Sequence, residues 1–180
     1  PPELGGRPML VRCALIERLF EQRDKRLLIL SAPAGFGKST VLYQFGQRLQ
    51  QTGARLAWLS CDEADSEPQR LLLYIIGAIE RVVPGFGEQV SNLLHSEITL
   101  PLEALVDAFQ ADLQKVEGEL YVALDDFHRI RHPGLVSGAR YLVERLPKNI
   151  HLITCTRFKP RFLYDEPWAF WLKAEDLRLS

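Results

Sequence analysis

Cysteine is scarce in this sequence, and the few cysteines follow no metal-binding or disulfide pattern. Three occur, at Cys13, Cys61 and Cys155, and each lies in or beside an apolar run. Zinc sites and disulfide frameworks need close, paired spacings, which this widely separated and odd-numbered set lacks. We therefore expect three small, buried thiols in a reducing compartment, and so a cytoplasmic protein.

Long hydrophobic runs and an excess of one charge are also missing. The longest strongly apolar stretch, residues 71–79, is too short for a bilayer, which takes about 20 residues. No secretory signal pattern opens the chain, so we expect no membrane role. The net charge is −1 and no block of lysine or arginine stands out, which argues against direct nucleic-acid binding by this segment.

The composition is that of one globular domain. Hydrophobic residues make up 47% and charged residues 25% of the 180 residues, enough for a single substantial core. The chain begins Pro1-Pro2 without an initiator methionine and stops within a strand-like stretch, residues 177–180. We therefore expect residues 1–180 to form one domain of a longer polypeptide.

A glycine-rich loop is the most informative feature. Residues 31–40 read Ser-Ala-Pro-Ala-Gly-Phe-Gly-Lys-Ser-Thr, after an apolar run at 27–30 and before a segment with helical spacing. Strand, glycine loop and helix form the context in which a phosphate-binding P-loop is expected. Backbone N–H groups and the positive end of the helix then surround the phosphates. The predicted nucleotide-binding residues are Ala34, Gly35, Phe36, Gly37, Lys38, Ser39 and Thr40.

Two side chains of this loop have separate predicted roles. Lys38 would reach the β- and γ-phosphates, and the Ser39 hydroxyl would be a ligand of Mg²⁺. One departure is visible, because Ala32 stands where the strict pattern begins with glycine. The alternative is an ordinary strand-to-helix turn with a solvated lysine, and the intact Gly-Lys-Ser-Thr with its flanks favours the nucleotide site.

A second strand ends in two carboxylates. Residues 120–126 read Leu-Tyr-Val-Ala-Leu-Asp-Asp, apolar on both faces as in a central parallel strand. In P-loop enzymes the acidic residue at this strand end holds Mg²⁺, so Asp125 is the predicted metal ligand and Asp126 would orient or deprotonate water. Both could instead merely cap a turn. The basic residues that follow, His128, Arg129, Arg131 and His132, are expected to be solvated.

Arg157 follows another predicted strand, residues 150–155. A guanidinium at that edge of the sheet could sense a γ-phosphate through paired hydrogen bonds. It could equally be a surface arginine at a strand exit, and position alone does not separate the two.

The order of elements predicts an α/β fold. Strands are expected at 26–31, 55–61, 120–126, 150–155 and 175–179, and helices at 8–22, from the glycine loop to 51, at 68–82, 86–94, 102–116 and 135–146. Their alternation indicates a doubly wound parallel sheet of about five strands, with ligands at the carboxyl ends of the strands.

Within the acidic loop at 62–68, Ser66 is expected to cap the following helix, although a functional loop near the nucleotide is an alternative. Residues 158–169 are expected to be irregular, and the aromatic patch formed by Phe158, Phe162, Trp168, Phe170 and Trp171 is either core or interface.

Several of these segments resemble one protein family. The chain resembles the STAND-class P-loop NTPases in five segments. These are the glycine loop, Trp-Leu-Ser at 58–60 with its acidic loop, Leu-Asp-Asp-Phe-His at 124–128, Thr-Cys-Thr-Arg at 154–157 and residues 174–179. The likeness is greatest to the large ATP-binding LuxR-family (MalT-like) transcriptional regulators. In such proteins alanine is common at the position of Ala32.

The resemblance implies a three-layer P-loop NTPase domain of the ASCE type. Such domains bind ATP or ADP with Mg²⁺, self-associate in the ATP form and hydrolyse ATP slowly. Contact with DNA is made through a C-terminal helix-turn-helix domain that lies outside this sequence. By position, Lys38 and Ser39 would bind phosphate and Mg²⁺, Asp125 and Asp126 would form the acidic pair, and Arg157 would sense the γ-phosphate. Residues 7–12 would lie near adenine.

Three other functions remain to be weighed. A small-molecule kinase would need an arginine-rich lid, and residues 86–102 contain no such cluster. A GTPase would normally show Asn-Lys-x-Asp after a strand, and the sequence has none. A nucleotide-free interaction module would not need Lys38, Ser39, Asp125 and Asp126 intact. The leading hypothesis is an ATP/ADP-dependent regulatory switch.

Overall fold

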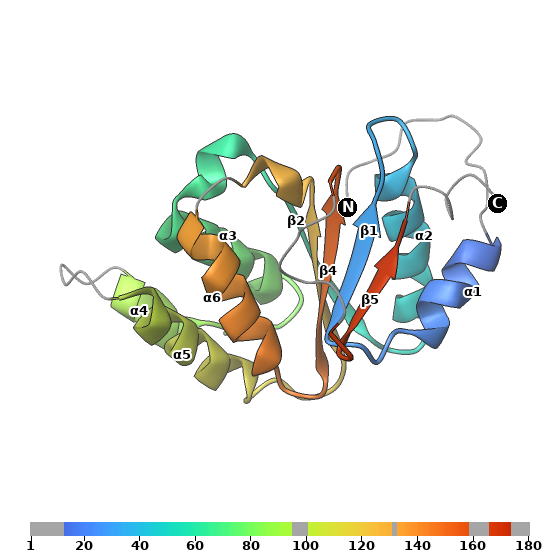
Figure 1. The fold of residues 1–180 in the computed structure, drawn as a ribbon. Coiled ribbons are helices and arrows are strands. Elements are labelled where there is room, and N and C mark those ends of the chain that lie inside the picture. Colours follow the sequence, from blue (N-terminus) through green and yellow to red (C-terminus); the bar gives the residue numbers. More distant parts are fainter. Residues whose placement is uncertain (1–12, 95–100, 131–132, 159–165, 174–180) are drawn as a thin grey trace.

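A parallel sheet of five strands lies at the centre of the protein (Figure 1). The computed structural model describes residues 13–94, 101–130, 133–158 and 166–173. The strands are β1 (Leu27–Ser31), β2 (Arg55–Ser60), β3 (Leu120–Asp125), β4 (Ile150–Thr156) and β5 (Ala169–Leu172), in the order β2-β3-β4-β1-β5. All neighbouring strands pair in parallel, which confirms the predicted α/β sheet.

Helices cover both faces of the sheet and explain why its central strands are apolar throughout. In Figure 1, α1 (Cys13–Glu21) and α2 (Lys38–Gln50) lie on one side of the sheet. The other side carries α3 (Pro68–Glu80), α4 (Glu88–Leu94), α5 (Leu102–Leu113) and α6 (Pro133–Glu144). Every residue of β1 and β3 is buried, as expected for strands packed on both faces.

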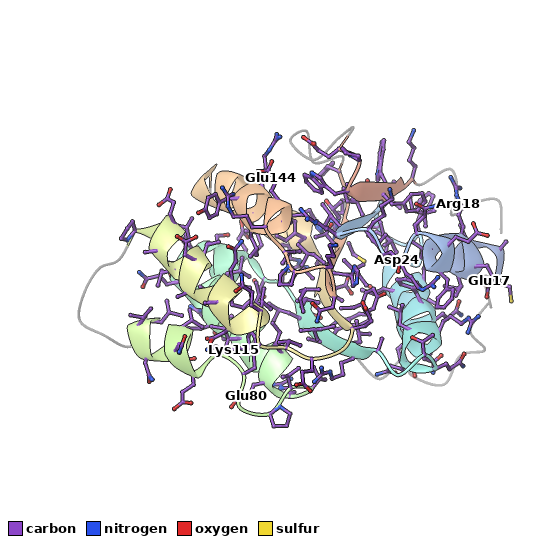
Figure 2. The ribbon with its side chains drawn as sticks, turned by 90° about the horizontal axis from the view of Figure 1, so that it is seen from below. Glu17, Arg18, Asp24, Glu80, Lys115 and Glu144 are labelled. Atoms are coloured by element: carbon purple, nitrogen blue, oxygen red, sulfur yellow. The ribbon has the colours of Figure 1, made fainter. Side chains whose placement is uncertain are left out.

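Two apolar clusters fill the spaces between these layers. Phe45 of α2 and Leu19 of α1 are fully buried against one face of β1, β3 and β4, and Ile79 and Phe109 belong to the cluster on the other face. Charged side chains such as Glu17 on α1 and Glu80 on α3 lie at the periphery (Figure 2). No helix among the described residues is both long and apolar enough to cross a bilayer.

The fifth strand is formed by a different segment from the one expected. The predicted strand at 175–179 lies outside the described residues, whereas β5 begins where the expected irregular stretch ends and contains Phe170 and Trp171 of the aromatic patch. Leu172 of β5 is fully buried, and Phe170 packs against the cluster beneath α1 and α2. Aromatic residues suit a pleated surface packed on both sides, so this part of the aromatic patch is core.

The helix α3 begins with a cap one residue later than the sequence indicated. Glu67, and not Ser66, is the N-cap: its two carboxylate oxygens accept the backbone N–H groups of Gln69 at 3.1 Å and Arg70 at 2.7 Å. The Ser66 hydroxyl instead donates to the carbonyl of Glu63 at 2.8 Å, within the preceding 3₁₀ turn η1 (Glu63–Ser66). A carboxylate holds two orphan donors of the first turn here, where a hydroxyl would hold one.

Replacing Glu67 by alanine is therefore expected to lower the free energy of unfolding by about 1 kcal/mol, the usual cost of losing a cap. Urea denaturation of the wild type, Glu67→Ala and Ser66→Ala would measure it. The serine variant is the matched control and should lose less, since its hydroxyl bonds to a carbonyl outside the helix. A larger loss in Ser66→Ala than in Glu67→Ala would restore the sequence-based assignment.

Candidate nucleotide-binding site

The glycine loop joins β1 to α2 in the conformation that its composition suggests. Gly35 and Gly37 have φ angles of 82° and 73°, in the left-handed region that favours glycine. Gly37 is the N-cap of α2, and its carbonyl accepts the N–H of Val41 at 2.9 Å, so the helix starts inside the loop. The N–H groups of the first helical turn have no partner within the helix and can therefore bind an anion.

Lys38 is held over the loop and is almost entirely buried, with 7% of its surface exposed. Its Nζ donates to the carbonyl oxygens of Ala32 at 2.8 Å and Pro33 at 3.0 Å. An ammonium group has three N–H bonds, so a phosphate oxygen can be bound beside these two carbonyls. The alternative of a solvated lysine in an ordinary turn is wrong for this loop, because Lys38 is buried and hydrogen-bonded.

The two carboxylates at the end of β3 lie in different environments. Asp125 is 5% exposed, and its Oδ1 accepts the backbone N–H of Asp126 at 3.0 Å. Asp126 has φ 54°, the one positive φ outside glycine among the described residues, and its side chain is 42% exposed. Asp tolerates this left-handed conformation better than most residues. The bend fixes Asp125 against the sheet and leaves Asp126 facing outward.

Strand order brings these features to one edge of the sheet. β4 lies between β1 and β3, with Leu30 of β1 level with Cys155 and Leu124 of β3 level with Thr154. The pairing continues past β1, since the N–H of Ala32 donates to the carbonyl of Thr156 at 3.2 Å. The glycine loop, the acidic pair and the exit of β4 therefore meet at the carboxyl ends of parallel strands, where α/β folds bind ligands.

Cys155 lies inside this site, and the sequence analysis missed its proximity. It is fully buried, and burial, followed by the nearby Asp125 carboxylate, raises the pKa of its thiol well above the ordinary value. The charge of Lys38 acts on the same thiol in the opposite direction. Cys155 therefore lies within electrostatic range of both a loop residue and an acidic residue. Alternation along two neighbouring strands places Cys155 and Asp125 on one face and could have predicted the contact.

Burial was expected of all three cysteines, but Cys13 is exposed.

Arg157 leaves the end of β4 as an exposed side chain beside a hollow at this edge. The hollow is lined by Glu63, His128, Arg129, Arg157 and Phe158. The positive charge of Arg157 acts on the pKa of His128, so the arginine is near the residues that follow the acidic pair. This location is compatible with a group that contacts a terminal phosphate, although Arg157 remains only a predicted sensor.

His128 is only partly exposed, whereas the sequence suggested a solvated side chain. Its side chain is 9% exposed, in the short 3₁₀ turn η2 (Phe127–Arg129), and its ring meets Phe158 edge to face with centroids 6.3 Å apart. Burial lowers its pKa; Asp126 opposes that shift, and the charges of Arg157, Lys38 and Arg129 add to it. Arg129, with 45% of its side chain exposed, does face solvent. Arg131 and His132 lie outside the described residues, as do residues 7–12, predicted to be near adenine.

A magnesium ion with phosphate ligands fits the residues present. Among the described residues, no group of three or more His, Cys, Asp or Glu side chains could hold a metal by itself. Mg²⁺ in nucleotide sites commonly takes one or two protein oxygens and completes its shell with phosphates and water. The Ser39 hydroxyl at the start of α2 and the carboxylate of Asp125 offer oxygens of the type that Mg²⁺ takes as ligands.

Comparison with known proteins agrees with this geometry. The AAA domain family matches residues 21–162. Among curated proteins, the HTH-type transcriptional regulator MalT of Yersinia enterocolitica is 28% identical over 151 residues, and that of Yersinia pestis is 29% identical over the same length. Both matches cover 84% of this chain and 16% of the relative, so the chain spans less than a fifth of those regulators.

Solved structures share the fold at low sequence identity. The ORC1 protein of Aeropyrum pernix, solved in complex with DNA, has a TM-score of 0.62 at 17% identity, covering 92% of this chain and 46% of that one. Cdc6p of Pyrobaculum aerophilum has a TM-score of 0.60 at 15% identity, covering 95% and 47%. The matched family region contains the glycine loop, the acidic pair and Arg157. The chain belongs to the AAA domain family of P-loop NTPases and is similar to the transcriptional regulator MalT.

Proposed function

We propose that this chain is the ATP/ADP-binding switch domain of a LuxR-type transcriptional activator. The observation that carries the proposal is that the loop with its buried Lys38 and the buried Asp125 carboxylate end β1 and β3, the two strands on either side of β4, at one edge of the sheet. A phosphate-binding cation and a metal-binding anion at one sheet edge suit a magnesium nucleotide. The similarity to MalT, a transcriptional regulator by its name, supports a regulatory role for the nucleotide.

Each predicted residue has a distinct task in this proposal. The backbone from Ala34 to Thr40 surrounds the phosphates, and Lys38 neutralises the charge between the β- and γ-phosphates. Ser39 and Asp125 hold Mg²⁺, which offsets negative charge on the phosphate oxygens when it is bound. Asp126, exposed beside them, orients or deprotonates the attacking water. Arg157 contacts the γ-phosphate and so distinguishes ATP from ADP.

The switch would act through association with other proteins or domains. In this proposal the ATP form self-associates, slow hydrolysis returns the domain to the ADP form, and both occur in the cytoplasm. DNA is reached through a helix-turn-helix domain elsewhere in the polypeptide. The net charge of −1 supports this division, because a domain binding phosphate backbones directly is normally basic.

Calorimetric titration of this chain with ATP, ADP and GTP in the presence of Mg²⁺ tests the proposal. Adenine nucleotides should bind and GTP should bind at least tenfold more weakly. Equal affinity for GTP would remove the adenine specificity, and no binding by any nucleotide would favour an interaction module. Added small-molecule alcohols or acids that accelerate ATP turnover would instead favour a kinase.

Replacing Asp125 by asparagine should reduce the dependence of ATP binding on magnesium. The amide retains an oxygen but loses the charge that Mg²⁺ prefers, so adding metal should improve affinity much less than in the wild type. Titrations with Mg²⁺ and with a chelator measure this ratio. Asp112→Asn is the matched control, because Asp112 is also 5% exposed and binds Lys115 at 2.8 Å in α5. An unaltered ratio in Asp125→Asn would end the metal assignment.

Replacing Arg157 by alanine should bring the affinities for ATP and ADP closer together. A charge-assisted hydrogen bond contributes about 1.5–3 kcal/mol, so ATP affinity should fall about tenfold while ADP affinity changes little. Competition titrations of both nucleotides measure the ratio. Arg145→Ala serves as control, since Arg145 stacks over the Tyr141 ring at the end of α6. Wild-type discrimination in Arg157→Ala would make the arginine a surface residue.

A further inference from the structure

His128 is a partly buried residue that the proposed mechanism does not use. Its side chain is 9% exposed, and its Nδ1 is enclosed without making a hydrogen bond to any described residue. Leaving a buried polar atom without a partner costs about 1–3 kcal/mol. Such atoms are rare in folded proteins, and one reason for keeping them is a functional role. The position of this nitrogen therefore needs an explanation.

The acceptor facing His128 Nδ1 is the carboxylate of Asp126. The distance from Nδ1 to Asp126 Oδ1 is 3.8 Å, which is too long for a hydrogen bond. The other oxygen, Oδ2, lies 4.0 Å from Nε of Arg129. The Asp126 side chain is 42% exposed and can rotate, and a movement of about 1 Å would bring its oxygen into hydrogen-bond range.

The turn itself fixes the imidazole beside this carboxylate. Within η2 the N–H of Arg129 donates to the carbonyl of Asp126 at 3.0 Å, and the N–H of Ile130 donates to that of Phe127 at 3.1 Å. The Phe158 ring meets the imidazole edge to face. The histidine is therefore the fixed partner, and the exposed carboxylate is the one that can move.

Charges from four elements decide which form the imidazole takes. Asp126 and Arg129 face it from the same turn, Arg157 from the end of β4 and Lys38 from the start of α2, while Glu63 of η1 lines the same hollow. Burial lowers the pKa of the ring, and the three cations together favour the neutral form as well. A neutral ring carries one N–H. Because a lone pair on Nδ1 would point at a negative oxygen, the hydrogen belongs on Nδ1.

We propose that His128 is a positioning residue for Asp126: its Nδ1–H donates to the carboxylate and directs it toward the water that attacks the γ-phosphate. This inference rests on the proposed function, and it assigns to His128 no contact with the nucleotide. The proton stays on the imidazole throughout. An oriented carboxylate spends less time in unproductive rotamers, so removing the donor should slow hydrolysis without weakening ATP binding.

Nitrogen-15 NMR of the chain labelled at histidine tests the contact without nucleotide. The chain has four histidines, and loss of one signal in His128→Phe identifies the resonance. We expect the Nδ1–H tautomer for His128 in the wild type. In Asp126→Asn the titration midpoint of this resonance should move to lower pH, because the charge that opposes the lowered pKa is gone. The Nε2–H tautomer, or an unmoved midpoint, would overturn the inference.

Single-turnover hydrolysis of ATP tests the consequence. His128→Phe keeps the ring beside Phe158 and loses the donor, so turnover should fall about tenfold while the affinity for ATP stays within about twofold. His128→Asn, which places an amide donor near the Nδ1 position, should recover most of the rate. Equal rates in all three proteins would overturn the positioning role, as would an Asn variant no faster than Phe.

The outcomes separate this inference from the proposed function. A chain that binds no adenine nucleotide contradicts the proposed function, while the NMR comparison of wild type and Asp126→Asn still decides the contact. If the chain binds ATP but hydrolyses it no faster than Lys38→Ala does, there is no base to orient. That result overturns the positioning role and leaves the nucleotide site in place.

Discussion

Replacing Lys38 by alanine is expected to weaken ATP binding about 100-fold. The ammonium is buried and lies over the glycine loop, where it can reach the phosphates of a bound nucleotide. A hydrogen bond to a charged group contributes about 1.5–3 kcal/mol, and each 1.4 kcal/mol is about tenfold in affinity. Removal also leaves the carbonyls of Ala32 and Pro33 without their donor, which loosens the loop that must surround the phosphates.

Calorimetry with Mg-ATP measures this loss, and Lys25→Ala provides the matched control. Lys25 precedes β1 at the opposite end of the strand and donates to the carbonyl of Pro167 at 2.8 Å. The same change of charge there should leave ATP affinity within about twofold. Thermal unfolding of both variants separates loss of the site from loss of the fold. Wild-type affinity in Lys38→Ala would contradict the placement of the phosphates in this loop.

The features that the sequence predicted well are those with short-range causes. The glycine loop is recognisable because its left-handed glycines, lysine and following helix are contiguous in the chain. Strand β3 is recognisable because burial on both faces requires an unbroken apolar run. Alternating strands and helices then give the parallel sheet, and the sheet places the strand ends together.

The features that the sequence did not predict depend on packing between distant segments. A histidine in a basic loop suggests a solvated group, and only the fold shows that the Phe158 ring meets it edge to face. No local alternating pattern marks the strand β5. It forms because the edge of β1 is open to pairing, and Phe170 lies opposite Leu28 of that strand. Likewise, residue preferences favour Ser66 as the cap, and only the backbone conformation shows that the Glu67 carboxylate takes that place.

Cys155 illustrates a constraint that follows from the same geometry. It lies on β4, the strand that separates β1 from β3, and the charges of both Lys38 and Asp125 act on its thiol. A charged residue there would add an uncompensated charge beside two others, whereas a thiol with a raised pKa stays neutral. A neutral thiol on that strand forms an ion pair with neither Lys38 nor Asp125, which leaves both charges available to phosphate and metal.

Replacing Asp126 by asparagine is expected to reduce the rate of ATP hydrolysis at least 100-fold and to leave ATP binding intact. General-base catalysis contributes about 10²–10⁴ in rate, and an amide cannot accept the proton of the attacking water. Asparagine is the informative replacement because residue 126 has φ 54°, and Asn adopts this left-handed conformation readily. The turn η2 and its hydrogen bonds should therefore persist in the variant.

Single-turnover measurements with labelled ATP, alongside calorimetry, distinguish a lost base from a lost site. Asp24→Asn is the matched control: this aspartate has 83% of its side chain exposed and precedes β1, at the end of the strand opposite to the glycine loop. It should hydrolyse ATP at the wild-type rate. If Asp126→Asn also keeps that rate, Asp125 or a group from another subunit must activate the water. If both binding and rate fall, Asp126 holds the metal instead, and the two carboxylates exchange roles.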